Sequence, residues 1–272
     1  MSYHEALTAG PDFPTCRYAG SRLTFRGPRK RACGGHIAVL GGGSTFGRYV
    51  PEPYPDLLER LTGRRVINLG QRNAGPDVFL HDGAVLDMCR AARTVVVQVM
   101  GAHALSNRFY RVHPRRNDRF VEASAAMRLV FPELDFTDFH FTRHMLSRAA
   151  ELAPDRFGVL RDELRLAWLR RMEALVAAIG RPVVLLWMAP RAPQAGGDRL
   201  EDGDPAFVMR GMLTALQGRG VGLVEVGIGA PPSLEGKIFA EAERQIALSL
   251  PGLSVHRDAA QALARYLADP KP

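Results

Sequence analysis

The segment His36–Gly47 reads His-Ile-Ala-Val-Leu-Gly-Gly-Gly-Ser-Thr-Phe-Gly, an apolar run that enters a glycine cluster and then Ser44 and Thr45. A buried strand that ends in such a cluster presents a tight loop whose backbone N–H groups can face a ligand. The loop lacks the Gly-Lys-Ser/Thr ending of a P-loop, and no acidic residue closes a second strand as in a dinucleotide-binding motif. In the structural alternative, Ser44 and Thr45 only satisfy backbone groups of the next turn.

The densest polar segment of the chain is Asn107–Phe120, which also contains His113. It holds five arginines: Arg108, Arg111, Arg115, Arg116 and Arg119. Arginine forks match carboxylate, phosphate or sulfate bidentately, so we expect this segment to clamp an anionic small molecule. The alternative is an exposed basic loop that pairs with nearby acidic residues. Interspersed aromatic residues predict that the segment is anchored to the domain.

Three histidines have positions that invite chemistry. His103 follows a third apolar run, where it can donate to an oxyanion, act as a general base, or simply pack in the interior. His140 and His144 have the i, i+4 spacing of a metal pair on a helix. Because no HExxH glutamate and no third ligand accompany them, we expect packing or surface positions and no metal site.

Five apolar runs rich in Val, Ile and Leu predict buried parallel strands, at 37–40, 66–69, 94–100, 182–188 and 222–226. Helical patterns alternate with them, at 53–61, 78–92 and 205–216 and in a long middle section. This alternation predicts a three-layer α/β/α, flavodoxin-like fold with a doubly wound, five-stranded parallel sheet. Ligands of such sheets bind beyond the carboxyl ends of the strands.

Residues 1–34 have no clear period and end in the basic run Arg26-Gly-Pro-Arg-Lys-Arg31, which predicts an extension packed on the domain. Residues 35–272 are expected to form one domain. A helical insertion at about 120–180 follows the third strand, with helices near 120–130, 136–152 and 155–179. The Pro- and Gly-rich loop at 189–205 follows the fourth strand and is expected at the ligand-binding end.

The formal charge of +8 favours anionic ligands, but only three of the 36 basic residues are lysines and the arginines are scattered. Binding to nucleic acid is therefore not expected. Three cysteines without CxxC spacing argue against a disulfide scaffold and a structural zinc site. No apolar run approaches membrane-spanning length, and the first residues show no secretory signal, so a cytoplasmic protein is expected.

The segment from Ile37 to Gly75 resembles the opening of the SGNH/GDSL hydrolase superfamily, whose first motif is Gly-Asp-Ser-x-x-x-Gly. Here Gly42 and Gly43 occupy the Asp and Ser positions. The resemblance implies the α/β/α fold above and acyl-ester chemistry. The stretches Asn-Arg-Phe-Tyr and His-Pro-Arg-Arg-Asn-Asp-Arg-Phe are similar to an uncharacterised bacterial family, a resemblance that brings no activity with it.

The superfamily resemblance also implies roles for individual residues. Ser44, one residue beyond the motif serine, would be the nucleophile, and His256 matches the histidine of the final Asp-x-x-His motif, with Leu253 at its aspartate position. The oxyanion donors would be the backbone N–H groups near three positions, together with the side chain that replaces the asparagine of Gly-x-Asn: Gly43, Asn73 and Gly75, with His103.

Two functions follow. The first is acyl transfer or ester hydrolysis on an anionic small molecule, a coenzyme A conjugate or a saccharide. If Ser44 is not the nucleophile, His256 or His103 could activate a substrate hydroxyl for attack on an acyl donor such as acyl-CoA, with coenzyme A as the cofactor. The second is a non-catalytic binding protein that recognises a phosphate- or sulfate-bearing ligand through Arg108, Arg115 and Arg116.

Overall fold

The computed structural model of the chain describes residues 13–227 and 233–269. Its centre is a five-stranded, fully parallel sheet in the order β4-β3-β5-β8-β9. The strands are β3 (Ile37–Leu40), β4 (Val66–Asn68), β5 (Thr94–Gln98), β8 (Val183–Ala189) and β9 (Gly222–Gly227). They coincide with the five predicted apolar runs, so the predicted α/β fold is confirmed.

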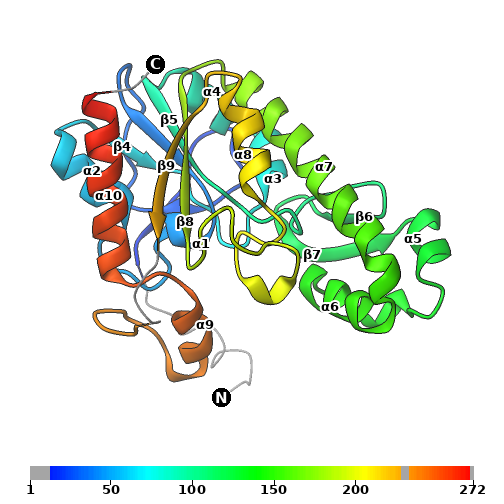
Figure 1. The fold of residues 1–272 in the computed structure, drawn as a ribbon. Helices are drawn as coiled ribbons and strands as arrows, with labels where there is room; N and C mark the ends of the chain where they lie inside the picture. The colour runs from blue at the N-terminus through cyan, green and yellow to red at the C-terminus, as the bar shows by residue number, and fades with distance from the viewer. Residues whose placement is uncertain (1–12, 228–232, 270–272) are drawn as a thin grey trace.

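Helices cover both faces of the sheet (Figure 1). One face carries α2 (Tyr54–Thr62) and α10 (Leu253–Ala268), which pack against each other. The opposite face carries α3 (Pro76–Leu80), α4 (Gly83–Arg90), α7 (Pro154–Ile179) and α8 (Arg210–Gln217). Because successive strand residues point to opposite faces, the core divides into two clusters, one under each helix layer.

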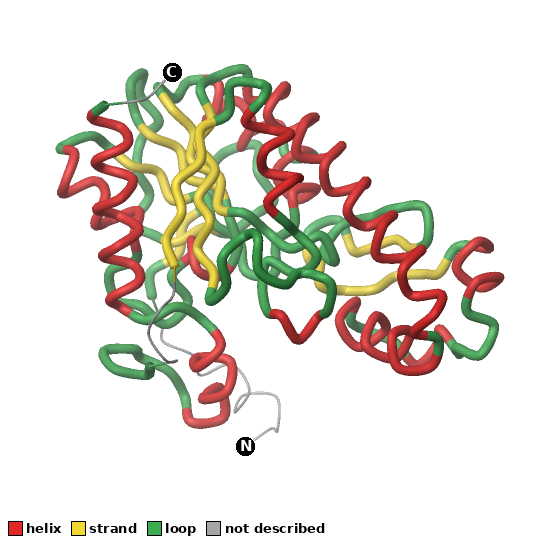
Figure 2. Tube along the Cα trace, viewed as in Figure 1, coloured by secondary structure: helices red, strands yellow, loops and turns green. Residues whose placement is uncertain are grey.

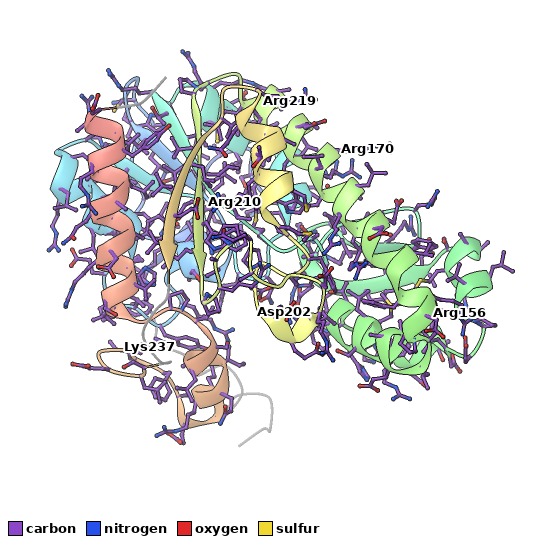
Figure 3. The ribbon with its side chains drawn as sticks, in the orientation of Figure 1. Arg156, Arg170, Asp202, Arg210, Arg219 and Lys237 are labelled. Atoms are coloured by element: carbon purple, nitrogen blue, oxygen red, sulfur yellow. The ribbon has the colours of Figure 1, made fainter. Side chains whose placement is uncertain are left out.

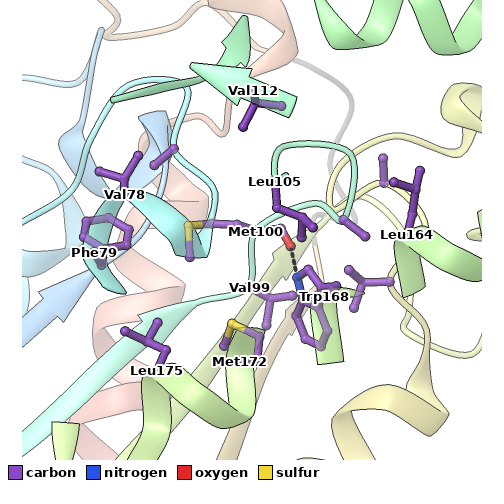
Figure 4. Packing of buried hydrophobic residues seen from close by; sticks show 14 of the residues in the cluster. Val78, Phe79, Val99, Met100, Leu105, Val112, Leu164, Trp168, Met172 and Leu175 are labelled. Atoms are coloured by element: carbon purple, nitrogen blue, oxygen red, sulfur yellow. Dashed lines mark hydrogen bonds between the residues drawn. The ribbon is translucent and has the colours of Figure 1, made fainter. Parts of the chain in front are cut away.

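The larger core cluster contains Trp168 of α7, which is fully buried (Figure 4). Its indole N–H donates to the carbonyl of Met100 at 2.8 Å, so the only polar atom of the side chain has a partner. Met100 follows β5, and this contact therefore fixes the long helix against the carboxyl end of the central strand.

The described part of the N-terminal extension packs on the domain. Its two short strands, β1 (Thr15–Cys16) and β2 (Phe25–Arg26), pair antiparallel, and Phe25 is fully buried in the larger cluster. The Arg26 guanidinium donates to three backbone carbonyls at 2.8, 3.2 and 2.8 Å, those of Gly47, Val50 and Pro51. Residues 1–12 of the extension lie outside the described residues.

The insertion after β5 begins with a β-hairpin of β6 (Tyr110–His113) and β7 (Arg116–Ala123) (Figure 2). The helices α5 (Ala125–Val130) and α6 (Thr142–Leu152) follow, and all four elements lie beside the amino-terminal half of α7. The helix predicted at 120–130 is wrong for its first residues, because these pair with β6. Ser124 then caps α5 by accepting the Met127 N–H at 3.1 Å.

Three further helices differ from expectation. The helix predicted at 136–152 begins only at Thr142, after a separate 3-10 turn at Phe136–Asp138. The helix predicted at 78–92 is divided into α3 and α4, because Asp82 accepts the Val85 N–H at 3.1 Å and starts a new helix. The helix predicted at 205–216 starts five residues late, at Arg210. Two short helices complete the set, α1 (Gly43–Phe46) and α9 (Arg244–Ser249). Among the described residues, no helix has the length and apolarity needed to cross a membrane.

Candidate functional site

The side chain of Gln98, the last residue of β5, holds the loop between β3 and α1 in place. The Gln98 Oε1 atom accepts the backbone N–H groups of Gly42 and Thr45, at 3.1 and 3.2 Å, and the Thr45 hydroxyl at 2.6 Å. Two N–H groups of the glycine loop therefore point into the protein. Gln98 was not among the predicted site residues, although a polar residue at the end of a buried strand was a signal for it.

Ser44 and His256 lie on separate elements and are not hydrogen-bonded to each other. Ser44 lies in the single turn of α1 and is 7% exposed, and none of the described residues accepts or donates a hydrogen bond at its hydroxyl. His256 lies near the start of α10, where its Nδ1 atom accepts the backbone N–H of Tyr54 at 3.1 Å. The expected nucleophile and base therefore do not form a pair in this structure.

The His256 ring is enclosed, with 1% of its surface exposed, and it stacks on the Tyr54 ring at a centroid distance of 6.0 Å. Burial, and then the charges of Lys237 and Arg26, lower the pKa of His256 to about 3. The ring is therefore neutral at neutral pH. Because Nδ1 is an acceptor, the proton of the neutral ring is on Nε2.

The Gly75 N–H, an expected oxyanion donor, is already used. It donates to Asn117 Oδ1 at 2.9 Å, and Asn117, which is completely buried, also donates to the carbonyl of His113 at 3.1 Å. Asn73 has a left-handed backbone, with φ of 59°, and its side chain donates to Asp118 Oδ2 at 3.1 Å. These bonds fix the turn of the β6–β7 hairpin beside the loop that follows β4.

Gly43, the third expected backbone donor, lies under the segment 233–250, which we call the C-terminal lobe. A Cβ atom placed on Gly43 would lie 3.9 Å from the side chain of Leu250. The Lys237 ammonium (Figure 3) donates to the carbonyls of Ala247 and Leu250, at 2.6 and 2.7 Å. The buried lysine therefore holds Leu250 over the glycine loop.

His103 lies in the loop after β5 and is buried. Its Nδ1 atom has no hydrogen-bond partner among the described residues, while its backbone carbonyl accepts the Tyr110 hydroxyl at 2.8 Å. Burial lowers the pKa of His103 to about 4, with the nearby Asp204 opposing this effect and Arg143 adding to it. Asp204 and Arg143 form an ion pair at 2.6 Å. His103 is thus a neutral imidazole with an unused ring nitrogen.

The predicted arginine clamp is divided among several partners. Arg108 pairs with Glu163 of α7 at 3.4 Å, Arg111 pairs with Glu122 at 2.7 Å, and the Arg119 guanidinium lies 4.1 Å from the centre of the Phe141 ring. These three side chains bind their own neighbours and do not converge on one point.

Two other predicted residues organise turns. Asn107 Oδ1 accepts the N–H groups of Phe109 and Tyr110, at 2.8 and 3.2 Å. His113 Nδ1 accepts the Arg115 N–H at 3.2 Å, which closes the hairpin turn. Arg115 is exposed at this turn, and Arg116 lies 4.0 Å from Asp118. Only this end of the predicted clamp lies beside the loop that follows β4.

We predicted from the sequence only part of a basic cluster that lies at the carboxyl ends of the strands, which we call the carboxyl edge of the sheet. Arg72 follows β4, and its guanidinium lies 5.2 Å from the centre of the Phe46 ring, at the end of the glycine loop. Partial burial, and then the charge of Arg48, lower the pKa of Arg72; Glu243 and Tyr49 oppose this effect, and Arg116 adds to it. We call Arg48, Arg72 and Arg116 the carboxyl-edge arginine cluster.

Arg48 of this cluster forms an ion pair with Glu243 of the C-terminal lobe. Arg72 has no carboxylate partner among the residues that the structure describes. The signal that could have found Arg72 is its place directly after a predicted strand, in the same loop as Asn73. Arg48 gives no such signal, since its pairing joins residues 195 positions apart.

The structure gives no grouping of three or more metal-ligating side chains within residues 13–227 and 233–269. His140 and His144 are both exposed, and His144 lies edge-on to the Phe139 ring at a centroid distance of 5.0 Å.

Several solved structures are similar to this chain. A lipase from a goat rumen metagenome is 10% identical with a TM-score of 0.46, over 85% of this chain and 96% of the lipase. A catalytic mutant of Axe2, an acetylxylan esterase from Geobacillus stearothermophilus, is 12% identical with a TM-score of 0.46, over 87% and 95%. A GDSL-like lipase from Bacteroides thetaiotaomicron VPI-5482 is 12% identical with a TM-score of 0.43, over 87% and 89%.

Comparison with curated proteins gives no match. A family described as "Domain of unknown function (DUF6473)" matches residues 1–270, almost the whole length. The chain therefore belongs to the DUF6473 family.

Proposed function

We propose that this chain is a non-catalytic binding protein for a phosphate- or sulfate-bearing small molecule, held at the carboxyl edge of the sheet. The observation that carries the proposal is the position of Arg72, beside Arg48 and Arg116 and with no carboxylate partner among the described residues. A guanidinium fork binds phosphate or sulfate bidentately. Glu243 pairs with Arg48 and Asp118 lies near Arg116, so a bound anion would supply the counter-charge that Arg72 lacks.

The hydrogen bonds of the expected catalytic groups support binding over hydrolysis. Nucleophilic catalysis by a serine needs a base within about 2.6–3.2 Å of its hydroxyl, whereas His256 Nδ1 serves Tyr54 and the ring is enclosed. An oxyanion hole needs unoccupied N–H donors. Of the three expected donors, the Gly75 N–H already has an internal acceptor, as do the N–H groups of Gly42 and Thr45 on either side of Gly43. Removing an anion-binding arginine is then the direct test.

The experiment is a calorimetric titration of the purified chain with coenzyme A, adenosine diphosphate, a sugar phosphate and a sulfated sugar. For whichever probe binds, Arg72→Ala is expected to weaken binding at least about tenfold, the loss of one charge-assisted bidentate contact. Arg93→Ala is the matched control, because Arg93 is exposed directly before β5, at the opposite edge of the sheet. Equal affinity in the two variants, or no heat with any of the probes, would overturn the proposal.

Acyl transfer is the second candidate. The Nδ1 atom of His103 has no partner among the described residues, and because this atom is buried, the reaction requires the loop after β5 to admit the substrate. In this reaction a substrate hydroxyl would give its proton to neutral His103 as its oxygen attacks the carbonyl carbon of an acyl-CoA. The carbon–sulfur bond would then break, and the thiolate of coenzyme A would take the proton from His103. Release of free thiol from acetyl-CoA in the presence of sugar alcohols measures this activity. It is expected to be lost in His103→Ala and kept in His144→Ala, whose ring is exposed; thiol release that persists in His103→Ala would exclude this role.

A further inference from the structure

A second basic site lies at the amino edge of the sheet, away from the carboxyl-edge arginine cluster. A cavity of about 620 Å³ opens there between the end of the N-terminal extension and the turn that precedes β4. Arg65, which lines this cavity, comes directly before β4, whereas Arg72 follows that strand. The two basic sites therefore lie at opposite ends of β4. The lining residues are Arg29, Lys30, Arg31, Ala32, Cys33, Glu59 and Arg65.

The charges of this cavity are unbalanced. Lys30 is neutralised, because its ammonium lies 3.3 Å from Asp56 and 3.0 Å from Glu59. The same Glu59 oxygen also accepts the backbone N–H of Val66 at 2.6 Å, so this carboxylate is committed. The three arginines of the cavity have no carboxylate partner among residues 13–227 and 233–269; they are Arg29, Arg31 and Arg65. Four basic residues against Glu59 give the lining a net charge of +3 (4 − 1), or +2 when Asp56 is included, so the cavity keeps an excess of positive charge.

The walls of the cavity are held in place by contacts of their own. Arg65 Nη1 donates to the carbonyl of Arg31 and to the Cys33 sulfur, each at 3.1 Å. The Arg29 guanidinium lies 5.7 Å from the centre of the Tyr18 ring, and the Tyr18 hydroxyl accepts the backbone N–H of Lys30 at 3.4 Å. These contacts tie the basic run of the extension to the turn before β4. Part of the entropy cost of gathering the arginines is therefore met before a ligand binds.

We propose that this cavity binds a small molecule with at least two linked phosphate groups, as in a nucleoside diphosphate or triphosphate or in inorganic polyphosphate. Three guanidinium forks exceed what one phosphate can engage and match a chain of phosphates. The volume falls in the range of about 300–1,000 Å³ that is usual for small-molecule pockets. The site is separate from the proposed function, which concerns the opposite edge of the sheet.

Cys33 gives this proposal a readout that needs no enzymatic activity. It is the exposed thiol of the chain, whereas Cys16 is half-buried and Cys89 is buried. A ligand in the cavity lies against Cys33 and should shield it from a neutral alkylating reagent. The measurement is the rate of iodoacetamide alkylation at Cys33, followed by peptide mass spectrometry, with tripolyphosphate, ATP or inorganic phosphate at constant ionic strength.

Tripolyphosphate or ATP at ten times its dissociation constant is expected to slow alkylation about tenfold, and inorganic phosphate far less. Slowing by both polyanions identifies the phosphate chain as the recognised part, and slowing by ATP alone adds the nucleoside. Arg29→Ala and Arg31→Ala should remove the protection. Arg64→Ala is the matched control, because Arg64 is an exposed neighbour of Arg65 that does not line the cavity.

Three results would overturn the proposal: no protection by either polyanion, equal protection in Arg29→Ala and Arg64→Ala, or stronger protection by single-stranded DNA, which would assign the edge to nucleic acid. Calorimetric titration of tripolyphosphate into each variant checks binding without the thiol. Arg72→Ala should keep the protection, so this test and that of the proposed function can fail separately. Melting temperatures of all variants verify that they are folded.

Discussion

The backbone N–H of Tyr54 donates to Nδ1 of His256 at 3.1 Å, and this bond joins the starts of two helices. Tyr54 is the first residue of α2, so its N–H has no acceptor within the helix. The preceding Pro53 has no side-chain acceptor to cap it. A ring nitrogen from α10 takes over this capping role, and the histidine thereby fixes the two helices on one face of the sheet.

The capping bond predicts that His256→Ala lowers the free energy of unfolding by about 2–4 kcal/mol, since the variant has a buried N–H without acceptor and a cavity where the ring was. Urea unfolding followed by circular dichroism measures the change. Arg257→Ala is the control, because the next residue is exposed and its loss should change stability by less than about 0.5 kcal/mol. Equal stability of the two variants would show that the bond does not hold the helices together.

Two buried histidines predict a loss of stability in mild acid. Burial lowers the pKa of His256 to about 3 and that of His103 to about 4, whereas unfolded histidine titrates near 6.5. Below pH 6.5 the unfolded chain therefore binds protons that the folded chain does not. The stabilisation is complete above pH 6.5 and is lost as the pH falls, down to about 4 for His103 and about 3 for His256, by about 1.4 kcal/mol per pH unit for each histidine.

Unfolding free energies at pH 7, 6 and 5 test this slope. His103→Asn is expected to reduce the slope by about half of the histidine contribution, since one of the two rings is gone. His140→Asn, which alters an exposed ring, should leave the slope unchanged. A wild-type slope equal to that of His103→Asn would mean that the folded protein does not exclude the proton from His103.

The sheet was predictable because its strands are buried on both faces. Val95, Val96 and Val97 all have no exposed surface, so the run is apolar throughout and the sequence shows it directly. The hairpin strand β7 was missed because its exposed positions mix with buried ones, and Phe120 looked like the start of the helix that begins at Ala125. The buried residues of β7 recur at every third position, Asn117, Phe120 and Ala123, and this spacing imitates a helical period instead of the alternation typical of a strand.

The candidate site was less predictable than the fold, because its contacts join distant parts of the chain. Tyr54 and His256 are 202 positions apart, and Gly42 and Gln98 are 56 apart. The residue types at the strand ends indicated where polar groups gather. Which group accepts from which depends on helix packing, and a local pattern does not contain that information.

Loss of the Gln98 side-chain acceptor is predicted to destabilise the protein far more than loss of the Ser44 hydroxyl in the glycine loop. Gln98→Leu keeps most of the side-chain volume but leaves the N–H groups of Gly42 and Thr45 and the Thr45 hydroxyl without their shared acceptor. The unfolding free energy should fall by about 2–4 kcal/mol. Ser44→Ala, in the same loop, should change it by less than about 0.5 kcal/mol, because its hydroxyl has no partner among the described residues. Urea unfolding of both variants measures the contrast, which vanishes if the loop does not depend on Gln98.

Position 75 is predicted to accept only glycine, because the backbone of Ala104 lies very close to it. A Cβ atom on Gly75 would lie 1.7 Å from the carbonyl oxygen of Ala104, which is backbone and cannot move aside as a side chain can. Gly75→Ala should therefore lower the unfolding free energy by about 3 kcal/mol or more. Because Gly75 also donates to Asn117, the hairpin turn that carries Arg116 should shift, and anion binding at the carboxyl edge should weaken with it.

The matched control is Gly83→Ala, where an added Cβ meets nothing within 4 Å, and its stability should equal or slightly exceed that of the wild type. Urea unfolding and calorimetric titration of both variants decide the matter: a Gly75→Ala protein as stable as Gly83→Ala would show that the β4–α3 loop can yield, and a destabilised one with unchanged affinity would separate the hairpin turn from the binding site.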